Sequence, residues 1–141
     1  MANYFELKEF LVSDTAKALG IDNTPSFEVV MNLKSLCDEV LNPLRAAWGS
    51  GIKVTSGYRC PKLNKAVGGV SQSVHQVGLA ADLVPSNGKI NEFLTFATDW
   101  ISKNCEFDQV IKEKQGQRKW LHVGLMSLTG AQRHQVLNIT K

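Results

Sequence analysis

A long amphipathic stretch at residues 27–48 constrains the fold most. Its apolar side chains recur mostly at three- and four-residue steps, so they lie on one side of an α-helix and are expected to pack against a core. This apolar stripe consists of Phe27, Val30, Leu33, Cys37, Val40, Leu41 and Leu44, and Trp48 extends it. Thr24 followed by Pro25 predicts the helix start, with Thr24 as its cap, and Gly49 and Gly51 predict its end.

Shorter periodic runs predict the remaining elements. Alternating or β-branched runs predict strands at 52–56, 79–84, 107–113 and 119–125, with a further edge strand at 135–140. Additional helices are expected at 13–19, ending at Gly20, and at 90–103. The strands at 107–113 and 119–125 are expected to form a hairpin with a wide turn at 114–118, and residues 60–78 a long irregular connection.

The size and charge of the chain argue against several classes of protein. With 141 residues, 43% of them hydrophobic, the chain can build one ordinary core, which predicts a single domain over residues 1–141. Sixteen Lys and Arg against thirteen Asp and Glu give a net charge of +3, and the basic residues are scattered. Nucleic-acid binding needs a basic stripe, so we expect no nucleic-acid partner. We also expect a monomer.

The N-terminal sequence and the cysteines bear on the cellular compartment. No segment reaches the length needed to span a bilayer, and residues 1–6 lack the basic and apolar regions of a signal peptide. We therefore expect a protein that is made in the cytoplasm without a signal peptide and has no membrane partner. Cys37, Cys60 and Cys105 lie far apart and form no CxxC pair, which predicts a reduced fold with Cys37 as a buried thiol.

Two of the predicted strands carry polar side chains that need an explanation. In the strand at 79–84, the two-residue period places Asp82 on one face with Ala80 and Val84. A lone carboxylate in an apolar strand is costly to bury unless it is paired or binds a metal. In the strand at 119–125, His122 lies on the face opposite the core residues, and Gly124 leaves room beside it.

His75, Asp82 and His122 together form a candidate metal site. Structural zinc sites usually have four protein ligands, whereas catalytic sites use three and keep the fourth position for water. Taken alone, each histidine is more often a solvated or backbone-bonded residue, and Asp82 could pair with Arg59. If the three side chains converge, the pattern indicates metal-assisted hydrolysis.

A series of short motifs resembles the zinc D-Ala-D-Ala carboxypeptidases of the M15 peptidase family, in particular the short single-domain forms of bacteria and phages. The resemblance covers nearly the whole chain, including the leading segment at residues 7–25. The motifs are Ser56-Gly57-Tyr58-Arg59, Asn64, Gly68-Gly69, Ser73-x-His75-x-x-Gly78-x-Ala80-x-Asp82 and Trp120-x-His122.

The resemblance implies a fold and a set of roles. The fold would be α+β, with a small antiparallel sheet packed on helices, as in these peptidases and in hedgehog domains with a related metal site. His75, Asp82 and His122 would bind one zinc ion. Arg59 would hold a substrate carboxylate and contribute to catalysis, and Ser73 would line the substrate site.

The chain departs from the family pattern at the catalytic base. Many members carry Glu three residues before the last histidine ligand, where this chain has Lys119, and others carry His five residues before it, where it has Gln117. Short members often have Glu at the position of Glu113, which is our predicted base. This role requires Glu113 to pair with Trp120 across the hairpin, so that it shares the face of His122. Asp108 and His134 remain as alternatives.

The resemblance implies hydrolysis of an amide bond in peptidoglycan stem peptides. The bond would be a terminal D-Ala-D-Ala or, as in phage endolysins of this family, an internal L-Ala-D-Glu. Peptidoglycan peptides would then be the partner, and the protein would act on the cell wall once released. The alternatives are a non-catalytic metal-binding module that binds peptidoglycan or a protein, which the missing Glu at position 119 favours, and a structural domain without metal.

Overall fold

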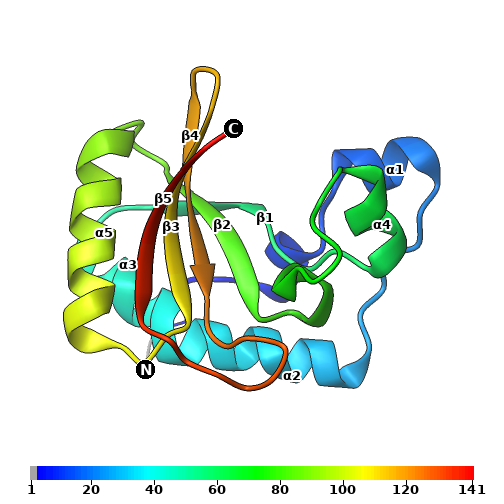
Figure 1. Ribbon diagram of the computed structural model, residues 1–141, viewed down its shortest axis with the longest axis horizontal. Coiled ribbons are helices and arrows are strands. Elements are labelled where there is room, and N and C mark those ends of the chain that lie inside the picture. The colour runs from blue at the N-terminus through cyan, green and yellow to red at the C-terminus, as the bar shows by residue number, and fades with distance from the viewer. Residues whose placement is uncertain (1–2) are drawn as a thin grey trace.

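Within residues 3–141, which the computed structural model describes, five strands form one sheet in the order β1-β2-β4-β3-β5 (Figure 1). Residues 1 and 2 of the predicted domain lie outside this range. The strands are β1 (Ile52–Ser56), β2 (Ala80–Pro85), β3 (Gln109–Gln115), β4 (Arg118–Gly124) and β5 (Gln135–Thr140). Together with the helices, the sheet confirms the predicted α+β class.

The sheet is mixed, so the expectation of an antiparallel sheet is wrong at one edge. The pairs β1–β2, β2–β4 and β3–β4 are antiparallel, whereas β5 runs parallel to β3. The chain reverses direction between β4 and β5, so β5 runs opposite to β4 (Figure 1). Because β3 is antiparallel to β4, β5 runs in the same direction as β3.

The long helix runs from Phe27 to Trp48 in three continuous parts. These are α2 (Phe27–Leu36), a π-helical turn η2 (Cys37–Leu41) and α3 (Asn42–Trp48), and the left-handed Gly49 ends the run. The predicted cap at Thr24 is wrong. Ser26 caps the helix, because its side chain accepts from the Val29 backbone N–H, whereas the Thr24 hydroxyl donates to Asp22.

The remaining helices are η1 (Leu7–Phe10), α1 (Asp14–Leu19), α4 (Pro61–Ala66), η3 (Val74–Val77) and α5 (Ile90–Asn104). The expected helices at 13–19 and 90–103 are confirmed. The expected irregular connection at 60–78 is wrong, because it contains α4 and η3. Pro61 begins α4 at a position where its missing N–H costs nothing, and the buried Leu63 anchors that helix.

The hairpin between β3 and β4 is tighter than expected. Gln115 pairs with Arg118, which leaves only Gly116 and Gln117 in the turn. Gly116 has a φ of 61°, in the left-handed region that two-residue hairpin turns require. The wide turn expected at 114–118 is therefore wrong, and the strands extend to the tip of the hairpin.

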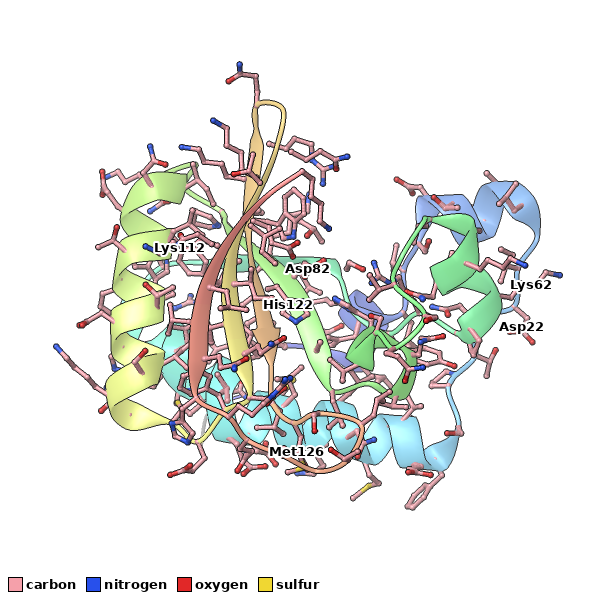
Figure 2. The ribbon with its side chains drawn as sticks, viewed as in Figure 1. Asp22, Lys62, Asp82, Lys112, His122 and Met126 are labelled. Carbon is pink, nitrogen blue, oxygen red and sulfur yellow. The ribbon has the colours of Figure 1, made fainter. Side chains whose placement is uncertain are left out.

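The core lies on one face of the sheet. Leu83, Val110, Leu121 and Val123 are fully buried there and share one apolar cluster with side chains of α2, α3 and α5. The opposite face carries Asp82, Glu113 and His122 and is not covered by these helices. Figure 2 shows Lys112 on the side of α5, as expected for a neighbour of Glu113 that points the other way.

None of the helices within residues 3–141 has the length and apolar character needed to cross a bilayer. Cys37, Cys60 and Cys105 are free thiols. Cys37 is partly buried, and burial raises the pKa of its thiol to about 12.

Candidate metal centre

Two of the predicted metal ligands come from neighbouring strands. Asp82 on β2 pairs directly with His122 on β4, and directly opposite residues of an antiparallel pair point to the same face. Figure 2 shows the two side chains next to each other near the middle of the sheet. Gly124 lies beside the imidazole, and a Cβ there would lie 3.4 Å from His122 Nε2, an ordinary van der Waals contact.

The third predicted ligand, His75, is held by the short helix η3. Ser73 Oγ accepts a hydrogen bond of 3.2 Å from the His75 backbone N–H, which caps this helix. The ring Nδ1 lies 2.7 Å from the carbonyl oxygen of Gly57. Because a carbonyl can only accept, Nδ1 carries a proton, and Nε2, which lies 3.3 Å from Asp82 Oδ1, is the nitrogen that can bind a metal. Metal-binding histidines commonly donate from their other ring nitrogen in this way.

The three side chains converge. Asp82 Oδ1 lies 3.3 Å from His75 Nε2 and 3.2 Å from His122 Nδ1, and the three candidate ligand atoms lie within 4.8 Å of one another. Tetrahedral zinc with bonds of about 2.0–2.1 Å separates two ligand atoms by about 3.3 Å. Two imidazole nitrogens and a carboxylate oxygen at this spacing therefore fit zinc, and the set provides three of its four ligands.

The surroundings keep Asp82 ionised. Burial alone raises the pKa of Asp82, but the positive charge and hydrogen bonds supplied by His75 and His122 outweigh burial and leave the pKa well below its ordinary value. A carboxylate that stays negative is the form that binds a cation. The buried Asp82 and His75 therefore form a cluster that suits a divalent ion.

The predicted substrate-binding pair lies beside this cluster. The Arg59 backbone N–H donates to the His75 carbonyl at 3.0 Å, and Arg59 Nη2 lies 3.4 Å from Ser73 Oγ. Burial lowers the pKa of Arg59, and the charges of Asp82 and Glu113 partly offset that effect. The buried Nε of Arg59 has no hydrogen-bond partner among the described residues. The guanidinium therefore keeps a donor free for an anion.

The hairpin register places Glu113 on the face of the metal ligands. Glu113 pairs with Trp120, as predicted, and the neighbouring pair joins Ile111 to His122. The Glu113 side chain is 9% exposed, and Oε2 accepts a hydrogen bond of 3.1 Å from Trp120 Nε1. Glu113 therefore lies in the cross-strand row next to that of His122. Its assignment as the base stays a prediction.

The alternative bases have other partners. Both carboxylate oxygens of Asp108 are bound by the Arg133 guanidinium, at 2.7 and 2.8 Å. His134 Nε2 lies 2.5 Å from Glu106 Oε2, and His134 is not among the residues that line the site. The position of His134 outside the lining argues against it, whereas Asp108 and Glu113 both line the site and both have a basic partner. Lys119, at the usual position of the base, instead donates to Asn91 on α5.

A cleft of about 1300 Å³ covers this face of the sheet. One wall contains residues 12–15 and 67–70, from the region of α1 and α4 on the right of Figure 1, and another contains residues of the hairpin and of the segment between β4 and β5. The three predicted ligands, Arg59, Ser73 and Glu113 all belong to the lining. The structure thus brings every predicted site residue into one cleft.

Comparison with known proteins identifies the family. A zinc-compatible triad in an open cleft of a small α+β domain is the arrangement of a metal-dependent hydrolase. A family model described as Peptidase M15 matches residues 3–124, and the chain belongs to this family. It is therefore a metallopeptidase by class. A search of the curated proteins finds no match to the chain.

Lys141 contacts Glu113 and was not predicted as a site residue. Its Nζ lies 3.1 Å from Glu113 Oε1. No local pattern marks this lysine, because the contact depends on the parallel pairing of β5 with β3. A prediction of the direction of β5 relative to β3 would have been needed to predict this contact.

Proposed function

We propose that the protein is a zinc-dependent peptidase that hydrolyses an amide bond of peptidoglycan stem peptides. The observation that carries this proposal is the convergence of His75, Asp82 and His122 in a cleft that also contains Glu113 and Arg59. Family membership supports peptidase activity, and the chemistry and spacing of the three ligand atoms support zinc.

His75 Nε2, Asp82 Oδ1 and His122 Nδ1 would hold the metal. When bound, zinc would polarise the scissile carbonyl and lower the pKa of a water molecule toward ~7. Glu113 accepts a proton from the attacking water and passes it to the leaving amine. Over the whole reaction the water oxygen bonds to the carbonyl carbon and the C–N bond breaks.

Arg59 fixes the position of the substrate. Its planar guanidinium presents paired donors that match a carboxylate, and Ser73 limits its rotation through the contact at 3.4 Å. A substrate carboxylate bound here sets which amide bond reaches the metal. Arg59 remains charged at ordinary pH, so an anion is its natural partner.

Two peptide bonds are candidates. A terminal D-Ala-D-Ala suits Arg59, because the carboxylate lies next to the bond that is cut. An internal L-Ala-D-Glu bond is the second candidate, and the extent of the cleft favours it. The lining continues past the predicted ligands toward residues 67–70 and toward Arg118. Both bonds occur in the cell wall, which would be the site of action after release.

Incubation of the zinc-loaded protein with purified muropeptides tests the proposal, and mass spectrometry of the products identifies the bond. The Glu113→Gln variant is the matched control. We expect it to retain zinc and the fold and to lose a factor of about 10²–10⁴ in turnover, as is typical for loss of a general base. Stoichiometric zinc without cleavage of any muropeptide would support the non-catalytic module instead.

A further inference from the structure

Each carboxylate oxygen of Glu113 lies beside the nitrogen of another side chain. Trp120 Nε1 donates to Oε2 at 3.1 Å, and Lys141 Nζ lies 3.1 Å from Oε1. Glu113 is 9% exposed, whereas the Lys141 side chain is 51% exposed. Trp120 belongs to β4 and Lys141 directly follows β5, so the hydrogen bond and the ion pair reach the carboxylate from different parts of the chain.

The backbone fixes where Lys141 lies. In the parallel pairing of β5 with β3, Ile139 is opposite Glu113 and Thr140 is opposite Lys114. The Lys141 backbone N–H continues this ladder by donating to the Lys114 carbonyl at 2.8 Å. Since side chains two residues apart share a face, Lys141 lies on the same side as Ile139 and can reach Glu113.

A second ion pair, between Arg133 and Asp108, holds the chain at the start of β5, as Lys141 does at its end. Arg133, just before β5, binds Asp108 with two hydrogen bonds from its guanidinium, and its backbone N–H donates to the same carboxylate at 3.1 Å. The family match ends at residue 124, so both Arg133 and Lys141 lie beyond the matched residues. The segment that contacts Glu113 and Asp108 thus lies outside the matched residues.

The Trp120 ring also contacts cations. Lys141 Nζ lies 5.7 Å and the Arg118 guanidinium 5.2 Å from the ring centre. These distances lie within the range of cation–π attraction. Lys141 therefore contacts both the carboxylate and the indole that donates to it.

We propose that Lys141 is a positioning residue that holds the Glu113 carboxylate in the orientation needed for proton transfer. This inference rests on the proposed function, in which Glu113 is the base. An ionised carboxylate has about four lone-pair sites, so the hydrogen bond from Trp120 and the ion pair with Lys141 leave sites that can accept the water's proton. A half-exposed ion pair contributes little to folding stability, but a misplacement of about 1 Å can reduce catalysis about a hundredfold.

The test compares Lys141→Met, Lys141→Arg and the control Lys114→Met. Lys114 is the neighbouring hairpin lysine, it is exposed, and its side chain points away from the cleft. In Lys141→Met we expect kcat to fall about tenfold to a hundredfold, with KM, zinc content and melting temperature nearly unchanged. Lys141→Arg should restore most of kcat, and Lys114→Met should behave as the unmodified protein.

A double variant separates positioning from a merely structural role. If Lys141 acts through Glu113, adding Lys141→Met to Glu113→Gln should cause no further loss of kcat. An unchanged kcat in Lys141→Met, or an equal additional loss in the double variant, would overturn the inference while leaving the peptidase intact. No cleavage by the unmodified zinc-loaded protein would overturn the proposed function and the role of Lys141 with it.

Discussion

The two faces of β4 share one backbone and differ in what surrounds them. On the helix-covered face, Leu121 and Val123 are fully buried among apolar side chains. On the cleft face, Trp120 donates to Glu113, and His122 lies 3.2 Å from Asp82. On the covered face, many apolar side chains of suitable volume could fill the core. The cleft face needs particular atoms at particular distances, and it therefore carries the function.

This difference predicts that substitutions on the two faces separate activity from stability. A change on the cleft face removes a ligand or a donor while the core keeps its packing. A change on the covered face leaves a cavity while the ligand set remains complete.

His122→Ala on the cleft face should have the largest effect on activity. It removes one of three protein ligands, so zinc affinity should fall steeply. Metal-ion catalysis contributes several kcal/mol, and its loss corresponds to at least about a thousandfold in kcat/KM. The melting temperature of the metal-free protein should stay within a few degrees. Metal analysis and thermal unfolding check both parts, and a variant that keeps stoichiometric zinc and full activity would exclude His122 as a ligand.

Leu121→Ala is the counterpart on the covered face. Leu121 is fully buried, and replacement of a buried leucine by alanine costs about 2–5 kcal/mol of unfolding free energy. Denaturant unfolding measures this loss. The folded fraction should still bind one zinc ion and keep its kcat, because the ligand side chains point away from residue 121. A loss of zinc from the folded protein would show that the two faces are coupled.

The sequence was sufficient for features that depend on local periodicity. The two-residue period placed His122 and Leu121 on opposite faces of one strand, as observed. The pairing of Glu113 with Trp120 was predicted because the proposed role of Glu113 requires it, and this pairing is observed. The motifs shared with the M15 family identified the candidate ligands, which lie far apart in the chain. Their convergence could be stated only as a condition until the structure was known.

Features that depend on long-range pairing or on competing local partners were missed. Thr24 has the right chemistry for a cap, but its hydroxyl binds Asp22 and Ser26 caps the helix. The edge strand at 135–140 was predicted with its correct bounds, but its parallel direction was not. That direction is set by the path of the chain after β4, and it determines whether Lys141 can reach Glu113.

Arg59→Ala should have an intermediate effect that depends on the substrate. Arg59 lines the cleft without joining the ligand cluster, so zinc should remain bound. For peptides that end in a carboxylate, kcat/KM should fall about tenfold to a hundredfold, because a charged hydrogen bond of about 1.5–3 kcal/mol is lost. The same peptides with an amidated end should show little change. An equal loss for both would mean that Arg59 does not bind the carboxylate.

Among these substitutions, Asp108→Asn should have the smallest effect. The effect should appear in how the melting temperature depends on pH. Hydrogen bonds from Arg133 hold the pKa of Asp108 below its ordinary value, so the folded state binds its proton less readily than the unfolded state. The Asp108 carboxylate therefore stabilises the fold above the unfolded-state pKa of about 3.9, and this contribution is lost as the pH falls through the lower folded-state pKa. The difference in melting temperature between the unmodified protein and Asp108→Asn should be largest near pH 7 and shrink below about pH 4. Asp99→Asn, in an exposed pair with Lys103, is the control and should show a smaller difference at every pH. The difference in melting temperature between the unmodified protein and Asp108→Asn could instead stay constant down to pH 2. That result would mean that packing, and not the ion pair with Arg133, holds the segment before β5 in place.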